Sequence, residues 1–60
     1  MYNNLEKMSL VEYRQNAMDV LRDYHGFIPE SIWQDAYVNV IMAWSESAIT
    51  RALHTCRDAL

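Results

Sequence analysis

The stretch that most constrains the fold is the run IWQDAYVNVIMAW at residues 32–44, the densest apolar segment of the chain. Its large side chains recur at spacings of four, three and four residues, at Trp33, Tyr37, Val40 and Trp44. This spacing is typical of one face of an α-helix and differs from the alternation of a strand. The chain is therefore expected to be all-α and to fold around a helix at this position.

A second helix is predicted before this run, over about residues 9–25. Ser9 and Glu12 match the S-x-x-E pattern of a capping box, in which each side chain bonds to the backbone N–H of the other residue. Gly26 stands where a left-handed residue often ends a helix, and Pro29 suits the first turn of the next helix. The short connection predicts that the two helices pack antiparallel as a hairpin.

The residues after this hairpin turn allow two architectures, because the apolar helix face shifts near residue 45. The favoured one is a single long helix over about residues 29–59, since no further Gly or Pro interrupts it. The alternative is a three-helix domain with a turn at residues 45–47. The long helix would carry a heptad-like seam for a second copy of the chain, which would form a helical bundle. The predicted self-association surface comprises Val38, Met42, Ser45, Ile49, Ala52, Leu53 and Cys56.

The size of the chain also favours an oligomer. Sixty residues are expected to form one small helical domain, with residues 1–8 as a loosely ordered lead-in. A chain this short buries only about 60% of the surface that its unfolded form exposes, and a single cysteine cannot form an internal disulfide. Hydrophobic residues nevertheless make up 52% of the sequence. A homodimer or a higher oligomer is therefore expected, because some of this apolar surface should face another chain.

The sequence predicts no catalytic, metal or cofactor site. His54 and Cys56 are two positions apart, so on a helix they point about 200° apart and cannot share a metal ion. Asp19 and Asp23 lie one turn apart, on what is expected to be a solvated face rather than in a cleft. A non-enzymatic protein without a cofactor is expected. The absence of a secretory signal and of a long apolar span predicts a cytoplasmic protein without membrane contact.

Two sets of residues are candidates for binding. Arg14 lies inside the apolar arc of the first predicted helix, where its charge must reach the edge or meet a partner. The favoured interpretation is that the aromatic stripe of residues 33–44 packs in the core or against a second copy and that Arg14 covers apolar surface at the helix edge. The alternative is that Arg14, Trp33 and Trp44 contact a protein partner. The second set is a possible nucleic-acid surface on the C-terminal helix, formed by residues at positions i, i+3 and i+6, namely Arg51, His54 and Arg57.

The charge balance favours the protein partner. The net charge is −3 at pH 7, whereas a broad phosphate-binding surface needs clustered Lys and Arg. The predicted function is therefore binding of another protein through apolar helix faces. The small size is typical of regulators, inhibitors and antitoxins, including accessory factors of phages and plasmids. The alternative function is a DNA-binding transcriptional regulator that uses the C-terminal helix.

Overall fold

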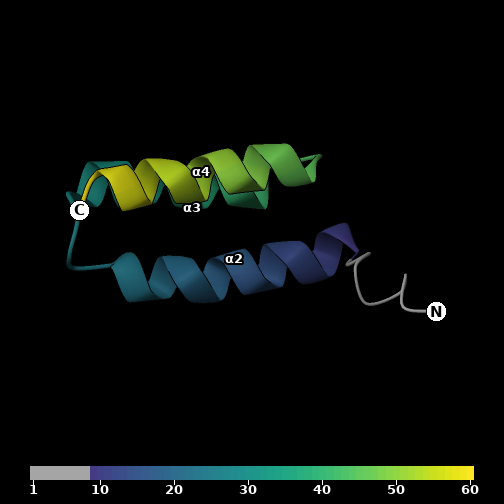
Figure 1. The fold of residues 1–60 in the computed structure, drawn as a ribbon, viewed down its shortest axis with the longest axis horizontal. Coiled ribbons are helices and arrows are strands. Elements are labelled where there is room, and N and C mark those ends of the chain that lie inside the picture. Colours follow the sequence, from purple (N-terminus) through teal and green to yellow (C-terminus); the bar gives the residue numbers. More distant parts are fainter. Residues whose placement is uncertain (1–8) are drawn as a thin grey trace.

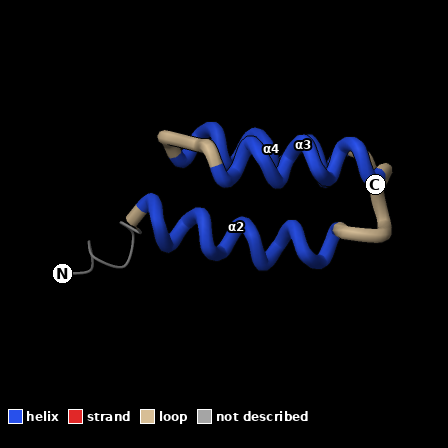
Figure 2. Tube along the Cα trace, turned by 180° about the vertical axis from the view of Figure 1, so that it is seen from behind, coloured by secondary structure: helices blue, strands red, loops and turns tan. Residues whose placement is uncertain are grey.

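A computed structural model of the chain describes residues 9–60, which form three α-helices joined by two short turns (Figure 1). The helices are α2 (Leu10–Tyr24), α3 (Glu30–Ile41) and α4 (Glu46–Asp58), and each contacts the other two. The chain runs up and down, so α3 is antiparallel to both α2 and α4 (Figure 2). The all-α prediction is confirmed, and the prediction for residues 1–8 lies outside the described residues.

The predicted capping box at the start of α2 and the left-handed glycine after its end are confirmed. The capping box starts α2: Glu12 N–H donates to Ser9 Oγ at 3.1 Å, and Ser9 N–H donates to Glu12 Oε1 at 3.3 Å. Beyond the end of α2, Gly26 adopts a φ of 95°, in the left-handed region that favours glycine. Pro29 then occupies the N-cap of α3, one position before its first helical residue.

The predicted long helix over residues 29–59 is wrong, and the three-helix alternative is confirmed. The chain turns at residues 42–45, slightly before the predicted turn at 45–47. The physical reason is a cap at Ser45, whose backbone is extended and whose Oγ accepts a hydrogen bond from the Ala48 N–H at 3.3 Å. A serine N-cap stabilises the start of a new helix, so the chain can break here without Gly or Pro.

The core lies between the three helices and consists of small and medium-sized apolar side chains. Leu21, Val40, Ile49 and Cys56 have no exposed surface. Alanines fill much of the remaining space and let the helices approach closely, at positions Ala17, Ala36, Ala43 and Ala52. None of the helices in residues 9–60 has the length and apolar character needed to cross a membrane.

Candidate functional site

The turn between α3 and α4 exposes a cluster of large apolar side chains. Trp44 is 91% exposed, Met42 is 67% exposed and Ile41 is 46% exposed. We call these three residues the apolar tip. Ala43, in the middle of the same segment, is buried in the core. The turn is therefore attached to the core at one residue while its larger side chains extend into solvent.

Arg14 on α2 holds the backbone of this turn in place. Its Nε donates to the Val40 carbonyl at 3.1 Å, and its Nη2 donates to the Ala43 carbonyl at 2.6 Å. The Val40 carbonyl lies in the last turn of α3, at the negative end of the helix dipole, where a guanidinium is favourable, and the Ala43 carbonyl lies in the turn that follows. Arg14 thus supports the apolar tip, and its side chain also lines a hollow beside that tip.

Two hollows adjoin the apolar tip. The first is bounded by Arg14 and all three residues of the tip. The second, which we call the α3–α4 hollow, is lined by Met42 and Trp44 together with Asn39, Arg51 and Thr55 and by small side chains between them. Trp44 lines both hollows, as do Met42 and Ala43.

Arg51 supplies a free positive charge in the α3–α4 hollow. Arg22 and Arg57 lie within 3.5 Å and 3.8 Å of aspartates on their own helices. Arg14 donates to the carbonyls described above. Within residues 9–60, the exposed Arg51 guanidinium has no hydrogen bond and no ion pair. The hollow therefore combines an apolar wall with an uncompensated cation.

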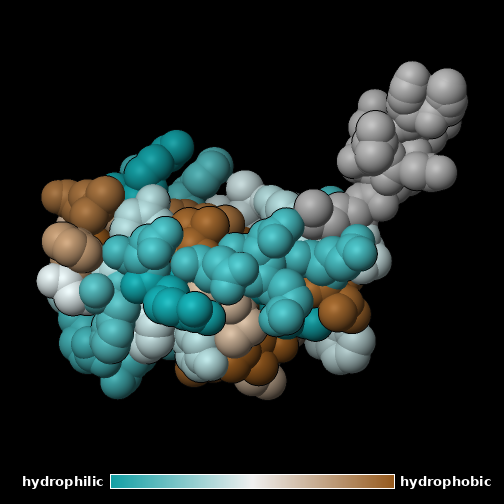
Figure 3. All heavy atoms as spheres, turned by 90° about the horizontal axis from the view of Figure 1, so that it is seen from below, coloured by the Kyte–Doolittle hydropathy of each residue, from teal (hydrophilic) through white to brown (hydrophobic). Residues whose placement is uncertain are grey.

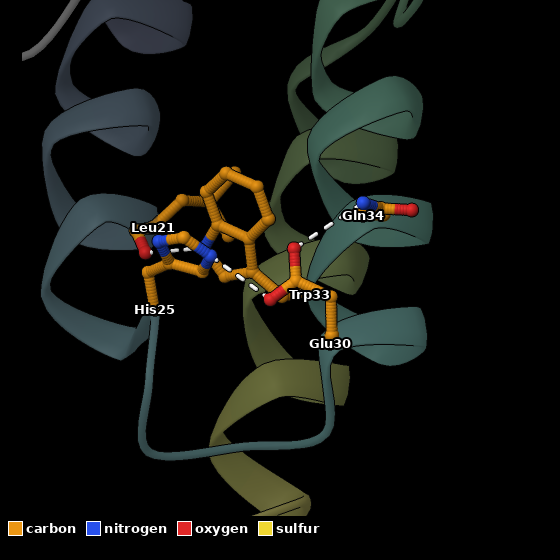
Figure 4. Close-up of polar contacts among 5 residues, drawn as sticks. All are labelled: Leu21, His25, Glu30, Trp33 and Gln34. Carbon is orange, nitrogen blue, oxygen red and sulfur yellow. Dashed lines mark hydrogen bonds and ion pairs between the residues drawn. The ribbon is translucent and has the colours of Figure 1, made fainter.

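Trp33 has a different environment, close to the connection between α2 and α3 (Figure 4). Its indole N–H donates to the Leu21 carbonyl at 2.6 Å, and its ring stacks on His25 and Tyr37 with centroid distances of 4.1 Å and 5.1 Å. The His25 ring also lies 3.0 Å from a carboxylate oxygen of Glu30. Trp33 was a candidate for partner contact, and the structure places it as a link between α2 and α3.

The predicted self-association surface is divided by the break between α3 and α4. Leu53 packs against the core, Ser45 caps α4, and Val38 and Met42 remain exposed on the α3 side. Three further members are buried in the core of the chain itself, namely Ile49, Ala52 and Cys56. The seam is therefore not continuous, because it required one unbroken helix. Self-association of the chain stays a prediction.

The outer face of α2 shows no broad apolar surface. It is largely hydrophilic in the view from the α2 side, where the hydrophobic groups are separate from one another (Figure 3). At the α3–α4 turn, by contrast, three exposed large apolar side chains, those of Ile41, Met42 and Trp44, lie within four consecutive residues. The turn is thus a stronger candidate for docking than the exposed face of α2.

The candidate nucleic-acid residues on α4 are all exposed. Arg51, His54 and Arg57 lie on its solvent side, as their spacing predicts. Arg57 is close to Asp58, with 3.8 Å between Nε and Oδ1, so part of its charge is already compensated. The basic surface that remains is small compared with the several phosphate contacts of a typical DNA-binding protein.

Cys56 is a free thiol buried in the core. Burial raises the pKa of the Cys56 thiol, because the charged thiolate is disfavoured away from water. This keeps the side chain protonated and weakly nucleophilic at neutral pH. Within residues 9–60, no group of three or more His, Cys, Asp or Glu side chains is placed to hold a metal ion.

Sequence reasoning missed Ile41 as a member of the apolar tip. In the predicted long helix, this residue was one position in a continuous apolar run. A correct prediction of the break after it would have identified residues 41–44 as an exposed turn. The one available signal was the polar Ser-Glu-Ser triplet at residues 45–47, which supplies the N-cap of α4.

No protein-family model, no curated protein and no solved structure matches this chain.

Proposed function

We propose that this chain is a small protein-binding module that docks through the apolar tip, Ile41, Met42 and Trp44. The observation that carries the proposal is the exposed indole of Trp44. Within residues 9–60, this ring makes no hydrogen bond and no aromatic contact. Tryptophan is enriched among the few residues that dominate the binding energy of protein interfaces.

The hydrogen bonds that order the backbone of the apolar tip favour binding. Arg14 fixes the carbonyls of Val40 and Ala43, and Ser45 caps the next helix, so the backbone is held on both sides of Trp44. A site that is already ordered loses less conformational entropy when a partner binds. Met42 adds a flexible and polarisable side chain that adapts to an irregular apolar surface.

The proposed activity is non-covalent and non-enzymatic. We propose that the chain acts through this binding as a regulator, an inhibitor or an antitoxin, the roles common among small accessory factors of phages and plasmids. The proposal places the chain in the cytoplasm, since its single cysteine, Cys56, is a buried free thiol and free thiols are typical of reducing compartments. A homo-oligomer remains part of the proposal, because Val38 and Met42 leave apolar surface exposed on the α3 side.

The test is affinity capture from the native cells, with the tagged chain as bait. Trp44→Ala is expected to weaken capture of the partner by about thirtyfold, the effect of a hot spot worth about 2 kcal/mol. Phe27→Ala is the matched control, because Phe27 is also an exposed aromatic residue, 74% accessible, but lies in the other turn. Equal capture by the Trp44→Ala variant and the parent chain contradicts the proposal.

The DNA-binding alternative is tested separately with a mobility-shift assay on mixed-sequence duplex DNA at physiological salt. We expect no tight binding, because the chain is acidic overall and its basic residues on α4 are few. Submicromolar binding that the double variant Arg51→Ala/Arg57→Ala abolishes would favour the DNA-binding function over the proposed one.

A further inference from the structure

We infer that the α3–α4 hollow binds an acidic peptide segment of a partner protein. In this arrangement an apolar side chain of the segment packs against Met42 and Trp44, and a neighbouring carboxylate pairs with Arg51. The inference rests on the proposed function and adds to it the chemistry of the partner.

The walls of the hollow provide the two kinds of contact that such a segment requires. Met42 and Trp44 are the large exposed apolar side chains, and Arg51 and Thr55 of α4 contribute polar groups to the same hollow. The remaining surface includes small side chains that leave room for an incoming residue, namely Ala43, Ala48 and Ala52.

The free guanidinium of Arg51 favours a ligand with an anionic group in the α3–α4 hollow. A planar guanidinium matches a carboxylate geometrically and can donate two parallel hydrogen bonds to it. Within residues 9–60, Arg51 has no competing partner that a ligand would have to displace. An apolar side chain packed on Trp44 would also exclude water from one side of the ion pair, which strengthens its attraction.

The surrounding charges favour a single carboxylate over a polyanion. The exposed acids Glu46 and Asp58 stand at the two ends of α4, and the whole chain has a net charge of −3. An extended phosphate backbone would pass close to these carboxylates and be repelled by them. A short peptide that presents one or two carboxylates beside an apolar residue makes contact with Arg51 and avoids both ends.

The experiment selects peptides on the immobilised full-length chain from a random library displayed on phage. We expect the enriched peptides to carry a large apolar residue next to Asp or Glu. A synthetic version of an enriched peptide should bind the Arg51→Glu variant at least about tenfold more weakly than the parent chain. Replacing its acidic residue with Lys should restore binding to Arg51→Glu, since the two charges are then exchanged.

Arg57→Glu is the matched control, because it makes the same charge change on the same helix at a residue that does not line the hollow. We expect this variant to bind the acidic peptide with less than half of the loss seen for Arg51→Glu. Equal losses would mean that long-range charge, rather than contact in the hollow, drives binding, and would overturn the inference.

The remaining outcomes separate the inference from the proposed function. Peptides that need Trp44 but bind Arg51→Glu unchanged overturn the inference and leave the proposed function standing. Failure to select any peptide, or peptides that ignore Trp44→Ala, counts against both. Analytical ultracentrifugation tests a second copy of the chain as the occupant: a dimer that Trp44→Ala dissociates would also overturn the inference.

Discussion

The two tryptophans of the chain lie near the two turns, and one of them, Trp33, joins two helices while the other, Trp44, is exposed. Trp33 donates its indole N–H to the Leu21 carbonyl and stacks on two neighbouring rings. Trp44 is 91% exposed and has no such contact within residues 9–60. Both come from one apolar run with helical spacing, so hydrophobicity alone does not distinguish them. The contrast shows that a docking residue is identified by its lack of partners inside the fold.

The turns themselves share one device. In each, a side chain from a neighbouring helix donates to backbone carbonyls at the end of a helix: Trp33 to Leu21 on α2, and Arg14 to Val40 on α3. The difference lies in what else the donor does. The indole of Trp33 both donates the hydrogen bond and packs against neighbouring rings at the first turn. At the second turn Arg14 donates the hydrogen bonds, and the indole of Trp44 stays exposed.

The largest expected effect follows from removing the packed indole. Trp33→Ala should lower the free energy of unfolding by about 3 kcal/mol, since it removes a large side chain and the indole N–H that joins α3 to the Leu21 carbonyl, which then keeps only the His25 backbone N–H. Urea denaturation followed by circular dichroism measures this change. Trp33→Phe keeps a ring without the N–H and should lose about 1 kcal/mol. If Trp33→Ala were as stable as the parent, the comparison between the tryptophans would fail.

The support of the second turn is tested by Arg14→Met. Methionine keeps an apolar stem of similar length but cannot donate to the Val40 and Ala43 carbonyls, so we expect a loss of about 2 kcal/mol. Gln15→Met is a control at the adjacent exposed position and should change stability by less than about 0.5 kcal/mol. An unchanged unfolding midpoint for Arg14→Met would show that the turn holds its shape without the guanidinium.

These contacts mark the limit of what the sequence could predict. The capping box at Ser9 and the left-handed Gly26 were predicted correctly, because both depend on residues a few positions apart. The hydrogen bonds of Arg14 join residues that are 26 and 29 positions apart, and no local pattern indicates them. The sequence placed Arg14 correctly at an apolar helix face but could not show that backbone carbonyls receive its charge.

The helix break was missed for a related reason. A serine N-cap is a weak signal within an apolar, glycine-free segment, and the heptad-like spacing on both sides of Ser45 suggested continuity. In the structure the α4 part of that spacing faces the core of the same chain, as the buried Ile49 and Cys56 show. The same periodicity therefore fits a seam for a second copy and a helix packed on its own neighbours, and three-dimensional contacts decide between them.

A smaller effect is expected at the first turn from Gly26→Ala. The φ of 95° is unfavourable for alanine, while a Cβ built on Gly26 has no atom within 4 Å. The cost should therefore come from the backbone conformation alone, at about 1 kcal/mol. Gly26→Asn should lose less, because asparagine enters the left-handed region more readily than alanine. An alanine variant as stable as the parent would contradict the role of this glycine in ending α2.

The smallest effect on stability is expected at Trp44, the residue on which the docking proposal depends. Trp44→Ala should change the free energy of unfolding by less than about 0.5 kcal/mol, because an exposed side chain without internal partners contributes little to folding. In the Trp33→Phe background, Trp44 is the single tryptophan, and its selectively excited emission should be that of a solvated indole and shift to the blue when an acidic peptide binds. A loss above about 1 kcal/mol in Trp44→Ala would show that the indole packs on the core, since burial of apolar area is what such a loss measures. Trp44 would then resemble Trp33 as a structural residue, and the apolar tip would lose its central contact.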